Sequence, residues 1–218
     1  MQGWASERVA RQRLVGRETN IRKRMDSRYS EAAMNVMICL LRGVNLAGHK
    51  KVPMEVLRNL CTSLKHCDVQ TYVQSGNVVF RTKESAPLVV ARKLEKAIEQ
   101  EFGFRSDVIV RTPSDLRDVI AKNPFAKRGG IEPSKLVVTF LPKEPEREAQ
   151  DVVRKIKANP EEIYLTGREL YVYYPDGMGR SKVSAVIDKA LQKGGTARNW
   201  NTVTKLLEMA EKLEGNKR

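Results

Sequence analysis

The chain has 218 residues, of which 41% are hydrophobic and 30% are charged, a composition typical of a globular protein rather than of a disordered or membrane chain. Its formal charge of +14 favours an anionic partner, either a small molecule or a nucleic acid. The apolar run Val36 to Leu41 is far shorter than the roughly 20 residues that a bilayer span requires, so we expect no membrane insertion.

The first 33 residues contain eight basic and four acidic side chains and no apolar stretch, which argues against a secretory signal peptide. They show neither helical nor strand periodicity. We expect residues 1–33 to be a basic, disordered extension that precedes the folded part of the chain.

The next segment predicts a strand at 36–41, a helix opened by Pro53, and a hairpin around Ser75 to Asn77, where glycine and asparagine tolerate a tight turn. Pro87 opens a second helix, which Gly103 ends, and residues 107–111 form a fourth strand. The first helix has one apolar face, formed by Leu57, Leu60, Cys61 and Leu64, and the second has another, formed by Leu88, Ala91, Leu94, Ala97, Ile98 and Phe102.

A helix at 114–121 then leads into a second run of the same order. We expect a strand at 135–141, a helix at 146–158, strands at 163–165 and 169–174, a helix at 183–191 and a short closing strand at 196–198. Asn199 is placed to cap a final helix.

The repeated order predicts an α+β fold of two tandem ferredoxin-like (βαββαβ) subdomains with a linking helix and a C-terminal helix. We place the first subdomain and the linking helix at residues 34–122. The second subdomain and the C-terminal helix occupy residues 123–218.

Polar and basic side chains gather in the loops at the ends of the predicted strands. In the first subdomain the candidates for ligand binding are Arg42, Asn45 and Lys51 in the loop RGVNLAGHKK, and Gln74, Ser75 and Asn77 at the hairpin tip. Glycines and polar residues are also ordinary turn formers, so a purely structural role is the alternative for both loops.

In the second subdomain, DGMGRSK offers Arg180, Ser181 and Lys182 at a helix start, and ARNWN offers Arg198, Asn199, Trp200 and Asn201 at another. A glycine turn with Ser181 as N-cap is the structural alternative for the first group. Capping by Asn199 and packing by Trp200 explain part of the second.

No motif in the sequence indicates a metal site or a nucleophile. His49 and His66 lack partners at metal-ligand spacing, and Cys39, Cys61 and Cys67 form neither a ligand set nor a disulfide framework, which favours a reducing compartment. We therefore expect no bound metal and a cytoplasmic location. Catalytic residues, cofactors and oligomeric state stay unassigned, and enzyme activity is left open.

Five separated segments together resemble the bacterial domain of unknown function 1697 family: LLRGVNLAGHKKVPM, TYVQSGNVVF, the tripeptide at 123–125, LYVYYPDGMGRSK and ARNWNTVTKLLEMA. The resemblance spans residues 36–213. It implies a pair of ferredoxin-like subdomains and a bacterial cytoplasmic setting, but no activity.

We expect a protein that binds an anionic small molecule, bearing a phosphate or a carboxylate, in a cleft between the two subdomains. One alternative is a non-enzymatic nucleic-acid-binding protein that uses its diffuse positive charge and stacks bases on a sheet face carrying Tyr171 and Tyr173. A protein-interaction scaffold is the other.

Overall fold

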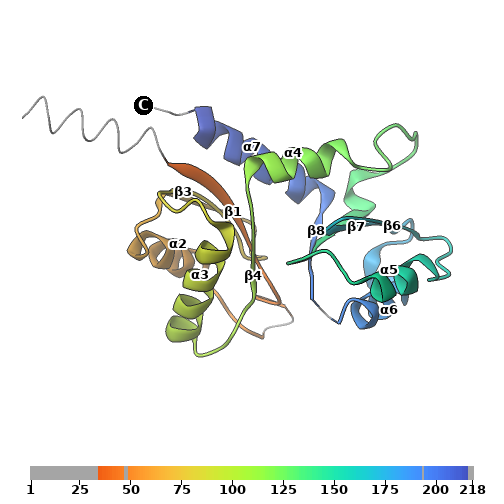
Figure 1. Cartoon of the computed structure of the whole chain (residues 1–218), viewed down its shortest axis with the longest axis horizontal. Helices are drawn as coiled ribbons and strands as arrows, with labels where there is room; N and C mark the ends of the chain where they lie inside the picture. The colour runs from red at the N-terminus through yellow and green to blue at the C-terminus, as the bar shows by residue number, and fades with distance from the viewer. Residues whose placement is uncertain (1–33, 47–48, 193, 216–218) are drawn as a thin grey trace, which may run out of the picture.

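The computed structural model describes residues 34–46, 49–192 and 194–215, so the extension predicted at 1–33 lies outside the described residues. Within these ranges the chain is a mixed α+β protein with two four-stranded antiparallel sheets and six α-helices (Figure 1). The order strand, helix, strand, strand, helix, strand occurs twice, as the sequence predicts.

The first sheet has the strand order β2-β3-β1-β4. Its elements are β1 (Asn35–Leu41), α2 (Met54–Ser63), β2 (Cys67–Tyr72), β3 (Asn77–Thr82), α3 (Pro87–Phe102) and β4 (Val108–Arg111). Strand β1 lies between β3 and β4 and is buried from Val36 to Leu41, which explains its unbroken apolar sequence.

A linking helix, α4 (Pro113–Ala121), follows, and Thr112 and Asp115 form a capping box at its start. The second sheet has the order β6-β7-β5-β8. Its elements are η1 (Pro133–Lys135), β5 (Leu136–Phe140), α5 (Arg147–Arg154), β6 (Glu162–Thr166), β7 (Glu169–Tyr173), η2 (Met178–Arg180), α6 (Val183–Ala190) and β8 (Thr196–Asn199), and α7 (Trp200–Gly215) ends the described chain.

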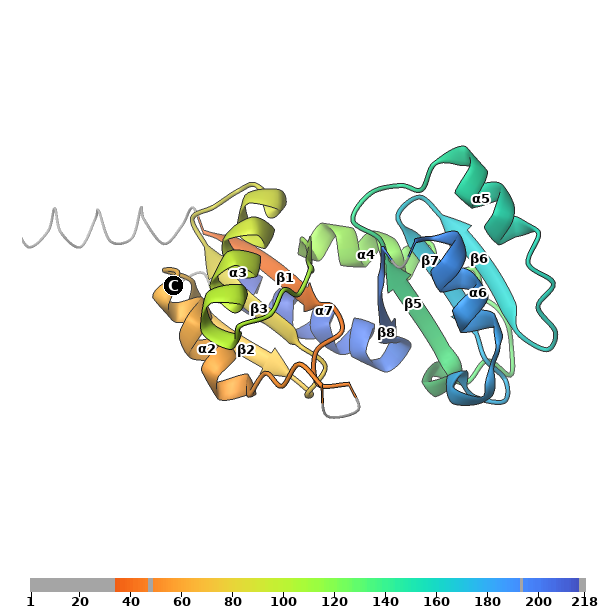
Figure 2. The ribbon, with the colours of Figure 1, turned by 90° about the horizontal axis from the view of Figure 1, so that it is seen from below.

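Each sheet is covered on both faces. Helices α2 and α3 cover the outer face of the first sheet, and α5 and α6 cover that of the second (Figures 1 and 2). The inner faces share one hydrophobic cluster with α4 and α7, which includes Ile38, Leu116, Val138 and Leu206. The space between the two sheets is therefore largely a packed core, and α7 contacts strands of both sheets.

Three sequence predictions are wrong in detail. The helix predicted at 146–158 ends at Arg154, and Ile156 and Ala158 beyond it pack against the hydrophobic cluster of the second sheet as part of the following loop. Leu88, placed on the apolar face of α3, is 62% exposed in the first turn. Asn77, placed at the hairpin tip, is the fully buried first residue of β3.

No helix among the described residues combines the length and the apolar character needed to cross a bilayer.

The three cysteines differ in environment, which gives a simple test of the packing. Cys39 and Cys61 are buried and Cys67 is exposed. Burial, and then the neighbouring Cys61, raise the pKa of Cys39 well above its usual value, and burial raises the pKa of Cys61 to about 12. Both thiols thus stay protonated and covered at neutral pH.

We expect a disulfide reagent such as DTNB to modify one thiol of the native protein quickly at about pH 8, and all three after unfolding in guanidinium. The Cys67→Ser variant should lose the fast reaction. Fast modification of two or three native thiols would contradict the packing of β1 against α2.

Candidate functional site

The loop that follows β1 is held against the β2–β3 hairpin by one side chain. Asn45, with φ +56°, accepts a hydrogen bond from the backbone N–H of Val52 at 2.8 Å. Its amide group donates to the carbonyl oxygens of Val52 at 3.0 Å and of Gln74 at 2.7 Å. Asn45 therefore fixes the loop internally, while the side chains of Lys51 and Gln74 beside it are exposed.

Arg42 lies at the other side of this loop. Its guanidinium forms an ion pair with Asp107 at 2.8 Å, and the two side chains are 31% and 68% exposed. The backbone N–H of Arg42 also donates to the carbonyl of Asp107. Arg42 is thus already paired with a carboxylate at the surface.

The residues from β1 to β4 are called the first unit, those from β5 to β8 the second unit, and the contact between them the seam. Arg198, in β8 of the second unit, reaches into the first unit and is 6% exposed. Its Nη2 donates to the carbonyl oxygens of Leu41 at 2.7 Å and Ser75 at 3.0 Å, and its Nε donates to Oδ1 of Asn77. Its Nη1 donates to the Oγ1 of Thr196 at 2.7 Å and to a backbone carbonyl of its own strand. These five residues, Leu41, Ser75, Asn77, Thr196 and Arg198, are called the Arg198 site below.

All five N–H groups of Arg198 are used, and every acceptor is a neutral oxygen. Burial lowers the pKa of Arg198 to about 10. The Arg198 site therefore holds a buried positive charge that no carboxylate among the described residues pairs with by hydrogen bond or ion pair.

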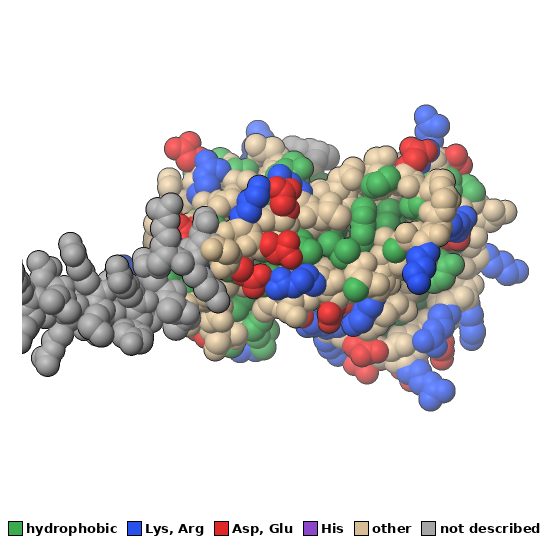
Figure 3. All heavy atoms as spheres, turned by 90° about the horizontal axis from the view of Figure 1, so that it is seen from above, with side chains coloured by type: hydrophobic (Ala, Val, Ile, Leu, Met, Phe, Trp, Pro, Cys, Tyr) green, Lys and Arg blue, Asp and Glu red, His purple; other side chains and the backbone are tan. Residues whose placement is uncertain are grey.

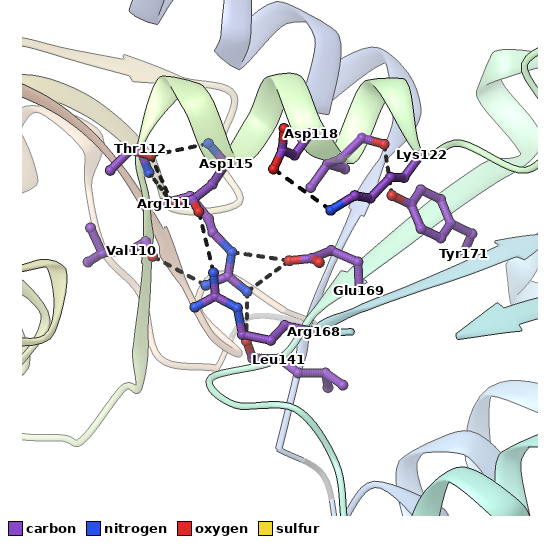
Figure 4. A network of polar contacts seen from close by, with 11 residues as sticks. Val110, Arg111, Thr112, Asp115, Asp118, Lys122, Leu141, Arg168, Glu169 and Tyr171 are labelled. Carbon is purple, nitrogen blue, oxygen red and sulfur yellow. Dashed lines mark hydrogen bonds and ion pairs between the residues drawn. The ribbon is translucent and has the colours of Figure 1, made fainter. Parts of the chain in front are cut away.

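A second buried arginine, Arg111 at the end of β4, is 2% exposed and crosses the seam in the opposite direction (Figure 4). It donates to the Oε1 of Glu169 from Nε at 3.2 Å and from Nη2 at 3.1 Å, and to the carbonyl of Leu141 at 2.7 Å. Nearby, Arg168 contacts Asp115 of α4 at 3.4 Å. Burial, and then the charge of Arg168, lower the pKa of Arg111, and Glu169 opposes this shift.

The two arginines occupy equivalent positions in the two sheets. Arg111 lies opposite Ile38 on the central strand of the first sheet, and Arg198 lies opposite Val138 on that of the second. On the other side of these strands, Asn77 lies opposite Leu40 and Glu169 lies opposite Phe140.

The contacts across the seam are therefore reciprocal. Arg111 binds Leu141 and Glu169 of the second unit. Arg198 binds Leu41 and Asn77 of the first unit. The difference lies in the partner side chain: a carboxylate neutralises one arginine, whereas an amide leaves the other uncompensated.

The remaining predicted ligand residues lie at two helix starts of the second unit. Asn199 caps α7, since its Oδ1 accepts from the N–H of Asn201 at 3.0 Å, and its amide donates to the carbonyl of Ser134 at 2.7 Å. Trp200 packs half-buried against the central core, and Asn201 is exposed. The capping role predicted for Asn199 is confirmed.

Ser181 accepts from the N–H of Val183 at 3.1 Å and donates to Glu161. Arg180 and Lys182 on either side of it are exposed. No hydrogen bond or ion pair among the described residues joins this group to the Arg198 site. The structure thus brings together the residues of the first loop, the hairpin and β8, and leaves Arg180, Ser181 and Lys182 as a separate group.

The sheet face proposed for base stacking is inside the protein. Tyr171 is 1% exposed and its hydroxyl donates to the carbonyl of Val119 at 2.7 Å. Tyr173 is also buried, and both rings belong to the central core. These rings are unavailable to a nucleic acid in this structure.

Arg111 and Glu169 were missed by the sequence analysis, although one signal was present. Arg111 ends the apolar run VIVR, where a charged residue rarely becomes buried without a partner. Its partner Glu169 is 58 residues away and carries no local signal.

The described residues include no group of three or more histidine, cysteine, aspartate or glutamate side chains arranged to hold a metal ion. Of the three thiols, Cys39 and Cys61 are buried and stay protonated, so neither offers an activated nucleophile. Arg198 contributes a buried guanidinium to this arrangement, and Lys51 and Gln74 contribute exposed polar side chains in the adjoining loops.

A family model described as "Protein of unknown function (DUF1697)" matches residues 34–171. Among solved structures, the conserved bacterial protein SP0830 from Streptococcus pneumoniae is similar, with a TM-score of 0.65 and 23% sequence identity, over 82% of this chain and 99% of that chain. At this identity the likeness shows a shared fold alone. No curated protein matches the sequence.

Proposed function

We infer the function from the residues of this protein alone, because the chain belongs to DUF1697, a family of proteins of unknown function. We propose that it is a cytoplasmic protein of two ferredoxin-like subdomains that binds a phosphate- or carboxylate-bearing small molecule beside the Arg198 site. The observation that carries the proposal is the buried guanidinium of Arg198, which has only neutral hydrogen-bond partners.

An uncompensated buried charge attracts an anion without touching it. At an effective dielectric constant of about 20, two opposite charges about 8 Å apart attract each other by about 2 kcal/mol. Arg198 would therefore act through its field, because its own N–H groups are occupied. The equivalent Arg111 supplies no such field, since Glu169 neutralises it.

Direct contacts would come from the exposed side chains of the adjoining loop. Lys51 directly precedes Val52, whose backbone is bonded to Asn45, and the same Asn45 holds the hairpin at Gln74. Lys51 has no partner among the described residues, so its ammonium group is available to an anion. Arg42 would first have to exchange Asp107 for the ligand.

The test combines identification with mutation. Native mass spectrometry of the full chain, purified without added ligand, should show a retained small anion. The protein is then titrated with inorganic phosphate and with citrate while the NMR signals of the hairpin amides are recorded. These signals should show saturable binding, and Lys51→Gln should weaken it about tenfold. Lys127→Gln, which removes the same charge from another exposed loop, is the matched control and should bind normally.

Equal binding by Lys51→Gln and by the unmodified protein would refute the site. A retained oligonucleotide would instead support nucleic-acid binding, whose affinity should fall steeply with salt. A co-purified protein would support the scaffold alternative. On the face that carries α4 and α7, basic and acidic side chains lie interspersed (Figure 3), which favours neither a nucleic-acid track nor a single charged patch there.

A further inference from the structure

The first unit carries a cavity of about 870 Å³ that none of the residues of the Arg198 site lines. Its walls come from the turn that follows α2, the start of β2, the end of β3 with the two residues after it, and Lys93 of α3. This volume lies within the range of roughly 300 to 1,000 Å³ that is usual for small-molecule pockets.

His66 lines the cavity and has unsatisfied hydrogen-bonding groups. The residue is 4% exposed, and neither Nδ1 nor Nε2 has a hydrogen-bond partner among the described residues. The ring stacks on Phe80 with centroids 4.1 Å apart and planes 7° apart, so its orientation is fixed. A buried imidazole with two unpaired nitrogens is costly, and such groups in native proteins usually find a water or a ligand.

The charged groups of the cavity wall leave a positive surplus. Its acidic side chains are both paired within the protein, Asp68 with Arg81 at 2.5 Å and Glu84 with Lys93 at 3.2 Å. The wall contains four basic and two acidic side chains, a surplus of two positive charges, because Lys65 and Lys83 also line it.

We propose that this cavity binds a small molecule carrying a phosphate monoester, with Lys65, Lys83 and Lys93 holding the phosphate and His66 completing its hydrogen bonds. A phosphate monoester carries between about −1.5 and −2 charges at pH 7, which matches the surplus of two, whereas a single carboxylate leaves one positive charge over. The site is independent of the function proposed above, since it shares no residue with it.

A neutral histidine suits this role. Burial, and then the charge of Lys93, lower the pKa of His66, so that at neutral pH one ring nitrogen donates and the other accepts. One nitrogen can therefore donate to a phosphate oxygen, while the other keeps its lone pair as an acceptor.

The chain has two histidines, which makes NMR a direct test. Inorganic phosphate is added to the full chain at constant pH and ionic strength, and the imidazole signals are followed. We expect the His66 signals to shift saturably, and to do so equally in the Lys51→Gln variant, because Lys51 belongs to the loop beside His49 and does not line this cavity. Lys93→Met should weaken this binding about tenfold or more.

Lys96→Met is the matched control, because Lys96 is on the same helix but lines a different cavity, and it should bind phosphate normally. Acetate should shift the His66 signals only at much higher concentration. The proposal is overturned if the His66 signals do not move, if both histidines shift together without saturation, or if the two lysine variants weaken binding equally. It is also overturned if acetate binds as tightly as phosphate.

Discussion

Arg198→Met should lower the free energy of unfolding by about 4 kcal/mol, because it leaves several buried acceptors without donors at once. The carbonyl oxygen of Ser75 and Oδ1 of Asn77 receive their hydrogen bonds at the seam from this guanidinium. The carbonyl of Leu41 would keep only a longer bond of 3.3 Å from the hydroxyl of Thr196. Methionine fills much of the same volume, so the loss reports mainly on hydrogen bonds rather than on a cavity. Guanidinium denaturation followed by circular dichroism measures the change.

Arg42→Met is the matched control for this prediction. It makes the same substitution at the residue next to Leu41. The ion pair of Arg42 with Asp107 is substantially exposed, so the free energy of unfolding should fall by less than about 1 kcal/mol. Hydrogen exchange adds a second readout: Arg198→Met should speed exchange in the hairpin of the first sheet, although the substitution is in the second. Equal stability of the two variants would show that the buried guanidinium contributes nothing at the seam.

The regular elements follow from short-range rules, and the sequence predicts nearly all of them. Proline and glycine mark the limits of helices by the conformations that their backbones allow. The observed helices begin within one residue of Pro53 and Pro87, and α3 ends directly before Gly103. The closing strand β8 was also predicted, although it is four residues long.

Long-range pairing is what the sequence could not supply. Arg198 was singled out for its donor-rich neighbourhood, but its partners lie up to 157 residues away, and no local pattern shows that its N–H groups are already used. Asn77 looks like a turn residue because it follows serine and glycine. Its burial depends on the arrival of Arg198 from the other sheet.

The tyrosine strand shows a related limit. Alternation predicts that Tyr171 and Tyr173 share one face of β7, which is correct, but not whether that face meets solvent or a core. The unbroken apolar sequence LYVYY was the available clue, because a strand covered on both faces needs no polar side. Helices α4 and α7, packed between the two sheets, supply the second cover.

The asymmetry between Asn77 and Glu169 connects the fold to the proposed function. Two units with the same order of elements exchange arginines across one seam, and one exchange is neutralised while the other is not. A positive charge thus stays beside the loop that carries Lys51. An Asn77→Asp substitution would supply the missing carboxylate and would neutralise this charge.

Gly76→Ala should lower the free energy of unfolding by about 3 kcal/mol, because alanine is disfavoured twice at this position. The backbone has φ +72°, and an added Cβ would lie 2.7 Å from Cβ of Leu41 and 2.7 Å from Cγ2 of Val44. Both neighbours are buried, and the Leu41 atom is fixed to the backbone of β1. Relief of the clash must therefore move the hairpin away from the central strand.

Gly103→Ala separates the two causes. Gly103 has nearly the same backbone angle, φ +73°, but no atom lies within 4 Å of its added Cβ, so only the conformational cost of about 1 kcal/mol is expected. The difference between the two variants in guanidinium denaturation measures the steric part. A displaced hairpin also moves the carbonyl of Ser75 away from Arg198. The double variant Gly76→Ala, Arg198→Met should therefore lose less unfolding free energy than the sum of the losses of the two single variants. Equal losses for the two glycine variants would mean that the hairpin does not pack tightly on β1.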